Sequence, residues 1–151
     1  MKIEEIIKTS TEIPAEKRVL LSLLYTEHII SERFSEILKP FDLSAEQFNV
    51  LRILRGQKGK PLNMSCIQER MIARTSNTTR LVDKLLAKEY VNRDTCNENR
   101  RKIEITITQK GLNILEQLDT IVEHFEKKAV SKLTSNELFV LTTLLEKIRE
   151  K

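Results

Sequence analysis

The chain has 151 residues, of which 40% are hydrophobic and 32% are charged, and its formal net charge is +4 at pH 7. This composition is typical of a single folded, helix-rich unit and argues against a disordered chain. Tryptophan is absent and 5% of the residues are aromatic, which disfavours binding of single-stranded nucleic acid by base stacking, and no apolar run approaches the length that spans a bilayer.

A long helix is predicted from Pro14 to about Lys39, after a short helical start. Proline is tolerated in the first turn of a helix, and Pro40 should end this one. The apolar side chains recur at helical spacing but extend around more than one face, so the helix should pack against more than one partner. The main apolar stripe consists of Leu20, Leu23, Leu24, Ile30, Phe34, Ile37 and Leu38.

Two short helices further along the chain predict a helix-turn-helix. They follow a helix that opens with a capping box at residues 44–47 and stops at Gly56. The first short helix runs from about 63 to 71. The second is capped by Thr75 or Ser76 and ends near Lys88. A tight connection between two short helices is the defining feature of the helix-turn-helix unit.

A β-hairpin and two further helices complete the predicted elements. One strand runs from Tyr90 to near Cys96, and residues 97–99 supply the turn. The return strand has period two, which places Ile103, Ile105 and Ile107 inward. Helices are then predicted from 109 to about 132, capped by Thr108, and from a second capping box at 134–137 to about 150.

This order predicts a mainly α protein with a small β-hairpin: a winged helix-turn-helix flanked by long N- and C-terminal dimerisation helices. Residues 1–40 form the N-terminal dimerisation helix, 41–108 the DNA-binding module, and 109–151 the C-terminal dimerisation helices. The terminal helices carry more apolar surface than the module can cover. We therefore expect a homodimer joined by both ends of the chain.

Positive charge is concentrated in the middle of the sequence. Between Arg55 and Lys102 there are twelve Lys or Arg and five Asp or Glu residues, whereas both flanking segments are slightly acidic. Solvated charge is the ordinary explanation for surface lysines and arginines. Their segregation into the segment that holds the helix-turn-helix and the hairpin instead favours a surface that faces the phosphates of duplex DNA.

The second short helix carries the candidate base-reading residues. At 100° per residue, Ser76, Asn77, Arg80 and Lys84 point away from its apolar arc. The start of this helix enters the major groove in helix-turn-helix complexes, where Asn pairs with adenine and Arg with guanine. Lys84 suits a phosphate. The alternative is that Asn77 only caps the helix and Arg80 pairs with a carboxylate.

The hairpin supplies a second set of candidate DNA contacts. Arg100 and Arg101 lie at its tip, where folding does not require them, and a narrow minor groove attracts inserted arginines. Arg93 and Lys102 flank the tip and suit phosphate contacts. The alternative is a charged turn that only keeps the hairpin solvated.

No catalytic, metal or cofactor site is predicted. Cys66 and Cys96 do not have the spacing of a disulfide framework or a zinc site, and inert thiols are the favoured interpretation for both. His28 and His124 lack nearby ligand residues, and no glycine-rich phosphate loop is present. Because the first residues lack the apolar segment of a signal peptide, we expect a cytoplasmic protein without membrane binding.

Three motifs taken together resemble the MarR family of bacterial transcription regulators. They are the segments 43–51 and 77–86, and the stretch from Asn99-Arg100-Arg101 to Ile107-Thr108-Gln109-Lys110-Gly111. The resemblance implies a winged-helix homodimer that binds a pseudo-palindromic operator. It also implies that small phenolic or anionic ligands, or oxidation, release the DNA. The family usually has Asp at the position of Asn99, where its carboxylate orients the arginine that corresponds to Arg101. Asn99 can still form a hydrogen bond with Arg101, but without charge assistance.

The resemblance also predicts an effector pocket between the long first helix, the helix from Ser44 and the DNA module. Its candidate lining residues are Tyr25, His28, Arg33 and Phe48. A ligand-relieved repressor is therefore the leading hypothesis. A regulator under metal or redox control is a rival, although the reactive Cys of oxidation-sensing relatives is missing from the first long helix. A helical protein adaptor without DNA binding is the other rival.

Overall fold

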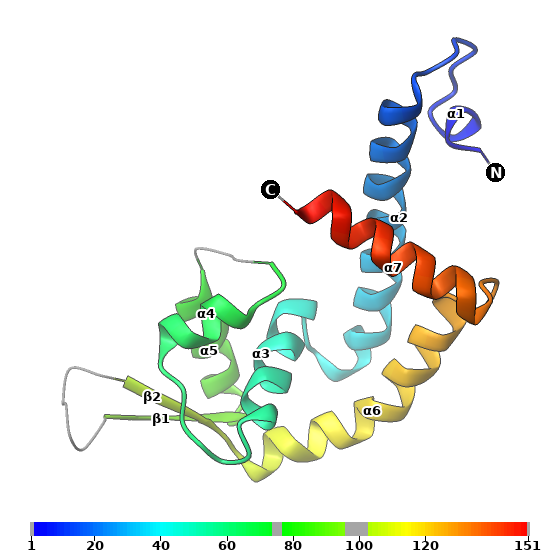
Figure 1. The fold of residues 1–151 in the computed structure, drawn as a ribbon. Helices are drawn as coiled ribbons and strands as arrows, with labels where there is room; N and C mark the ends of the chain where they lie inside the picture. Colours follow the sequence, from blue (N-terminus) through cyan, green and yellow to red (C-terminus); the bar gives the residue numbers. More distant parts are fainter. Residues whose placement is uncertain (1, 74–76, 96–102, 151) are drawn as a thin grey trace.

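The computed structural model describes residues 2–73, 77–95 and 103–150, and its described part is mainly helical with one β-hairpin. The order of the elements follows the prediction (Figure 1). They are α1 (Ile3–Ile6), α2 (Ala15–Leu38), the 3-10 turn η1 (Lys39–Phe41), α3 (Ala45–Gly56), α4 (Met64–Arg70), α5 (Thr78–Ala87), β1 (Val91–Thr95), β2 (Ile103–Ile107), α6 (Gln109–Ala129) and α7 (Ser135–Arg149).

Both predicted capping boxes are confirmed. The amide of Gln47 donates to Ser44 Oγ over 3.2 Å, and Gln47 Oε1 accepts from the Ser44 amide over 3.0 Å. At α7, the Glu137 carboxylate accepts from the Thr134 amide over 2.7 Å, which lowers the pKa of Glu137. These bonds satisfy amides that have no partner within the helix, so each helix begins where its sequence predicts.

Several boundaries differ from the prediction. The helix α2 ends at Leu38, and Pro40 lies inside the 3-10 turn that follows, after which Asp42 adopts a left-handed conformation. The helix α6 ends at Ala129, short of the expected Lys132, because the chain turns before the Thr134 cap. The N-cap position of α5 is Asn77; the predicted caps, Thr75 and Ser76, lie outside the described residues.

The hydrophobic core lies in the module built by α3, α4, α5 and the hairpin, and it is completed by the end of α2 and the first half of α6. Complete burial of large aliphatic side chains from all these elements fixes their relative positions. The side chains with less than 2% exposure are Leu38, Val50, Leu51, Leu54, Ile67, Val82, Leu85, Val91, Ile105, Leu115 and Leu118.

The hairpin is antiparallel, with Val91 opposite Ile107 and Arg93 opposite Ile105. Leu62 adds an isolated bridge, since its amide donates to the Ile105 carbonyl over 3.0 Å. Ile105 is buried, but Ile103 is 41% exposed, so the predicted inward row of isoleucines is wrong at Ile103. The reason is that this end of the hairpin extends past the core, where period two no longer decides burial.

The long helices project from the module (Figure 1). In this view α2 rises away from it toward α1, whereas α6 leaves it in another direction and continues into α7. The helices α2 and α6 contact each other, and Phe34 and Phe125 pack with their ring centroids 5.4 Å apart. None of the helices in the described ranges has both the length and the apolarity to cross a membrane.

Gly111 allows the start of α6 to pack closely against the start of the hairpin. A Cβ atom there would lie 2.3 Å from the Tyr90 carbonyl oxygen and 2.8 Å from Ile107 Cγ1.

We expect Gly111→Ala to lower the free energy of unfolding by about 1–3 kcal/mol, the usual cost of overpacking. Gly56→Ala is the matched control, because a Cβ there meets nothing within 4 Å. Urea unfolding of both variants checks this, and equal midpoints would contradict it.

Candidate DNA-binding site

The connection between α4 and α5 is tied to the core at both ends. Asn63 begins α4, and its Oδ1 accepts from the Cys66 amide over 2.8 Å. Met71 leaves the helix in an extended conformation and is buried, as is Thr78 at the start of α5. The Thr78 hydroxyl lies 3.9 Å from Met71 Sδ, so the two helices are held together across the turn.

The helix α5 has a buried face and an exposed polar face. Thr78, Val82 and Leu85 are buried, as the helical wheel predicts. Asn77, Arg80 and Lys84 are exposed on the other side, whereas Ser76 lies outside the described residues. Packing against α3 and α4 therefore turns these polar side chains away from the protein.

Arg80 and Lys84 form no ion pair with any residue of 2–73, 77–95 and 103–150. The alternative interpretation, in which Arg80 pairs with a carboxylate, therefore finds no support in this part of the chain. Both cations remain available on the polar face of α5. Their charge can be neutralised by phosphates or base edges of a bound duplex.

Arg93 has a partner that the sequence did not reveal. Its Nη2 lies 2.7 Å from Asp83 Oδ1, which joins β1 to the exposed side of α5. In this structure the guanidinium predicted to contact phosphate is held by a carboxylate of the same chain. The other wing candidates, Asn99, Arg100, Arg101 and Lys102, lie outside the described residues.

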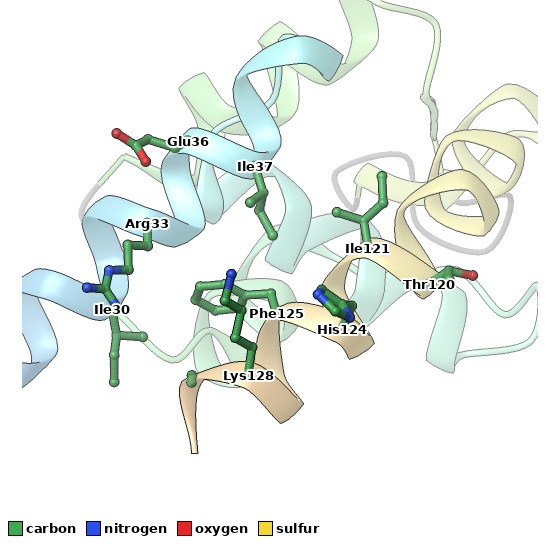
Figure 2. A pocket seen from close by; sticks show the side chains of 10 residues that line it. Ile30, Arg33, Glu36, Ile37, Thr120, Ile121, His124, Phe125 and Lys128 are labelled. Atoms are coloured by element: carbon green, nitrogen blue, oxygen red, sulfur yellow. The ribbon is translucent and has the colours of Figure 1, made fainter. Parts of the chain in front are cut away.

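A cavity of about 730 Å³ lies between α2 and α6 (Figure 2). Its wall combines aliphatic and aromatic side chains with three cationic or titratable nitrogen groups, those of Arg33, His124 and Lys128, and one carboxylate, Glu36. This mixture suits an amphipathic molecule with an aromatic body and a negative charge. The lining residues are Ile30, Arg33, Glu36, Ile37, Thr120, Ile121, His124, Phe125, Lys128 and Ala129.

The four residues predicted for an effector pocket do not line one cavity. Arg33 lines the cavity between α2 and α6, and it also lines a smaller one of about 490 Å³ with Tyr25. His28 is exposed on α2, whereas Phe48 is 3% exposed and packs edge-on against Phe34 with centroids 5.5 Å apart. The sequence predicted a pocket between the long first helix, the helix from Ser44 and the DNA module. The first of these, α2, does line both cavities, whereas Phe48 of the helix from Ser44 lies in the core.

Sequence reasoning missed the contribution of α6 to the cavity. His124 and Lys128 are one helical turn apart, as are Ile121 and Phe125, so the two pairs lie on one side of α6. That spacing is present in the sequence, but helical periodicity by itself predicts only which residues share a side of α6. Only the position of α2 shows that polar and apolar residues of α6 face the same cavity.

Metal binding gains no candidate site from the described residues. Within them, no group of three or more His, Cys, Asp or Glu side chains could hold a metal ion. Cys66 is a partly buried free thiol on α4, and Cys96 lies outside the described residues.

The sequence comparisons identify the family. The MarR family model matches residues 43–103, which include α3, α4, α5 and β1. The HTH-type transcriptional regulator SarZ of Staphylococcus haemolyticus is 30% identical over 112 residues, which cover 71% of this chain and 75% of SarZ. The chain belongs to the MarR family. Its members are transcription regulators and not enzymes, so the predicted resemblance is confirmed.

Solved structures show the MarR fold over nearly the whole chain. A MarR transcription factor from Planctomyces limnophilus has 30% identity and a TM-score of 0.70, covering 90% of this chain and 98% of that protein. A MarR variant from E. coli, complexed with operator DNA, has 23% identity and a TM-score of 0.79, covering 93% and 100%. The predicted fold class, a winged helix-turn-helix with long terminal helices, is therefore confirmed.

A third MarR-fold structure carries the same architecture at lower identity. BpsR of Bordetella bronchiseptica, whose DNA binding is regulated by 6-hydroxynicotinic acid, has 19% identity and a TM-score of 0.81, covering 93% of this chain and 99% of BpsR. At this identity the likeness shows the fold alone. Family membership, and not this structure, identifies the protein as a MarR-type DNA-binding transcriptional regulator.

Proposed function

We propose that this protein is a homodimeric repressor that binds a pseudo-palindromic operator and is released by a small amphipathic effector. The observation that carries the proposal is the polar face of α5, where Asn77, Arg80 and Lys84 are exposed opposite a fully packed apolar face. The solved complex of a MarR variant from E. coli with operator DNA supports this use of the same fold.

In this proposal α5 enters the major groove, where Asn77 and Arg80 read base edges and Lys84 contacts phosphate. Asn77 is at the N-cap position and makes no capping hydrogen bond through its side chain within the described structure, so its amide is available. Further DNA contacts are proposed on the sequence alone for the candidates outside the described residues, which are Ser76, Asn99, Arg100, Arg101 and Lys102.

The two cations of α5 are expected to differ in their effects on binding. Arg80→Ala should cost about 1–3 kcal/mol on the preferred operator and reduce base preference at one position. Lys84→Ala should weaken binding to all duplexes and lower the slope of log affinity against log salt by about 1. Lys132→Ala, an exposed cation in the turn between α6 and α7, is the control. Fluorescence anisotropy on operator and scrambled duplexes distinguishes these outcomes. Unchanged affinity in the Arg80 variant would remove α5 from the interface.

The long helices support the dimer in this proposal. Leu24 on α2 is 68% exposed, and Phe139 and Ile148 on α7 are 71% and 54% exposed. Apolar side chains on such extended surfaces mark an interaction site. A second copy is the natural occupant, because closed twofold symmetry is the commonest assembly and matches a palindromic operator.

Light scattering should give twice the chain mass of 17.6 kDa at micromolar concentration. Phe139→Asp should shift the mass toward that of one chain, because it would bury an unpaired charge in the interface. Ile72→Asp is the matched control: Ile72 is 93% exposed but lies in the DNA module, so the same charge there should leave the dimer intact. A folded wild-type monomer, shown by circular dichroism and light scattering, would exclude the dimer.

The cavity between α2 and α6 supports regulation by an effector. Phe125 lines this cavity and contacts Phe34, which in turn packs on Phe48 of α3. A ligand that displaces Phe125 would therefore shift Phe34, and through Phe34 it would shift Phe48 of the DNA-binding module. Release of DNA requires that the ligand bind the DNA-free conformation more tightly than the DNA-bound one.

We expect 6-hydroxynicotinic acid, chosen because it regulates BpsR, to weaken operator binding, and neutral phenol to act only at much higher concentration. Loss of a charge-assisted hydrogen bond in Arg33→Met or Lys128→Met should raise the half-effective concentration about tenfold. Lys132→Met is the matched control. If neither this acid nor a panel of other hydroxylated aromatic acids changes DNA affinity, the effector part of the proposal fails while DNA binding stands.

A further inference from the structure

Asp83 lies on the polar side of α5, where a carboxylate should hinder DNA binding. It follows Arg80 by one helical turn and precedes Lys84, and its side chain is 52% exposed. At 100° per residue Asp83 lies 60° from Arg80 on the wheel of an ideal helix. A negative charge in that position would repel the phosphates of a duplex on this face unless a cation neutralises it.

Arg93 supplies that cation from the hairpin. It is opposite Ile105 in the strand register, and opposed residues share one face of a sheet. Val91 and Ile105 on this face are buried against the core. Arg93 therefore projects from the inner face of β1, and its Nη2 reaches Asp83 Oδ1 over 2.7 Å. The Arg93 side chain is 31% exposed, less than the side chain of Asp83.

Beyond this pair the inner face of the hairpin loses its packing. Thr95 and its register partner Ile103 are both exposed, and Ile103 has 41% of its surface open. Within the described residues, the Arg93–Asp83 pair is therefore the last side-chain link from the hairpin to α5 before the strands leave the core. The angle at which β1 and β2 extend beyond Arg93 therefore depends on the contact between Arg93 and Asp83.

We propose that Asp83 and Arg93 are positioning residues that fix the angle between the wing and the DNA-reading face of α5. In this role Arg93 pairs with Asp83 and does not contact a DNA phosphate. Asp83 contributes to DNA affinity although its charge is negative, because it holds the hairpin at a fixed angle to α5. This inference rests on the proposed role of α5 as the helix that enters the major groove.

The sign of one substitution tests the proposal. Asp83→Ala removes a negative charge from the DNA-facing side, so simple electrostatics requires tighter binding. The positioning role requires weaker binding, by at least about 2-fold, the lower end of the coupling between contacting residues. Asp94→Ala is the matched control: it removes the same charge from β1, where Asp94 is exposed and forms no ion pair with a described residue. The control should bind equally or more tightly.

A double variant separates positioning from direct contact. If the pair acts as a unit, Asp83→Ala with Arg93→Gln should lose no more affinity than the more damaging single change. If Arg93 binds phosphate, Arg93→Gln should cost affinity in either background and lower the salt slope by about 1, while Asp83→Ala alone strengthens binding. If Asp83 accepts a hydrogen bond from cytosine, its loss should change base preference at one operator position. Either result would overturn the positioning role.

Two further measurements keep the outcomes distinguishable. Thermal unfolding of every variant should change little, because exposed ion pairs contribute little to stability. A large loss of stability in Asp83→Ala would assign the pair to folding and not to positioning. Arg80→Ala is the reference for the proposed function: if it leaves affinity unchanged, α5 does not read DNA. If Arg80→Ala weakens binding while Asp83→Ala strengthens it, only the positioning role fails.

Discussion

Burial of one face of α5 is the interaction on which the DNA-binding surface depends. Val82 and Leu85 are completely buried against the module, and Thr78 is nearly so. An α-helix places residues three and four apart on the same side, so fixing these positions also fixes the outward direction of Asn77, Arg80 and Lys84. A packing defect beneath α5 would thus disturb the candidate DNA-binding surface without changing any of its exposed residues.

The same module is joined to the long helices by two kinds of contact. Phe34 packs between Phe48 of α3 and Phe125 of α6, and Arg55 of α3 forms two hydrogen bonds of 2.8 and 2.9 Å to Asp119 of α6. The hydrogen bonds to Asp119 raise the pKa of the Arg55 guanidinium. These contacts connect the cavity between α2 and α6 with the helix on which α5 is packed, which is the physical basis for proposing regulation there.

In the proposed positioning role, Arg93 serves DNA recognition without contacting DNA. The sequence predicted that Arg93 contacts phosphate, because it flanks the hairpin tip. The structure instead gives Arg93 a partner in Asp83, across the boundary between strand and helix. Position in the strand register, more than charge, decides its role, because only inner-face residues can reach α5.

The sequence by itself determined the elements and the outward face of α5. Capping boxes at Ser44 and Thr134 are local hydrogen-bond patterns, and helical periodicity is also local, so both could be read without knowledge of the fold. Its errors arose where distant segments meet. Tertiary structure alone decided that Ile103 is exposed and that His124 and Lys128 share a cavity with Arg33. It also decided that Arg93 pairs with Asp83, because such neighbours depend on how helices and strands are placed, and periodicity carries no information about that placement.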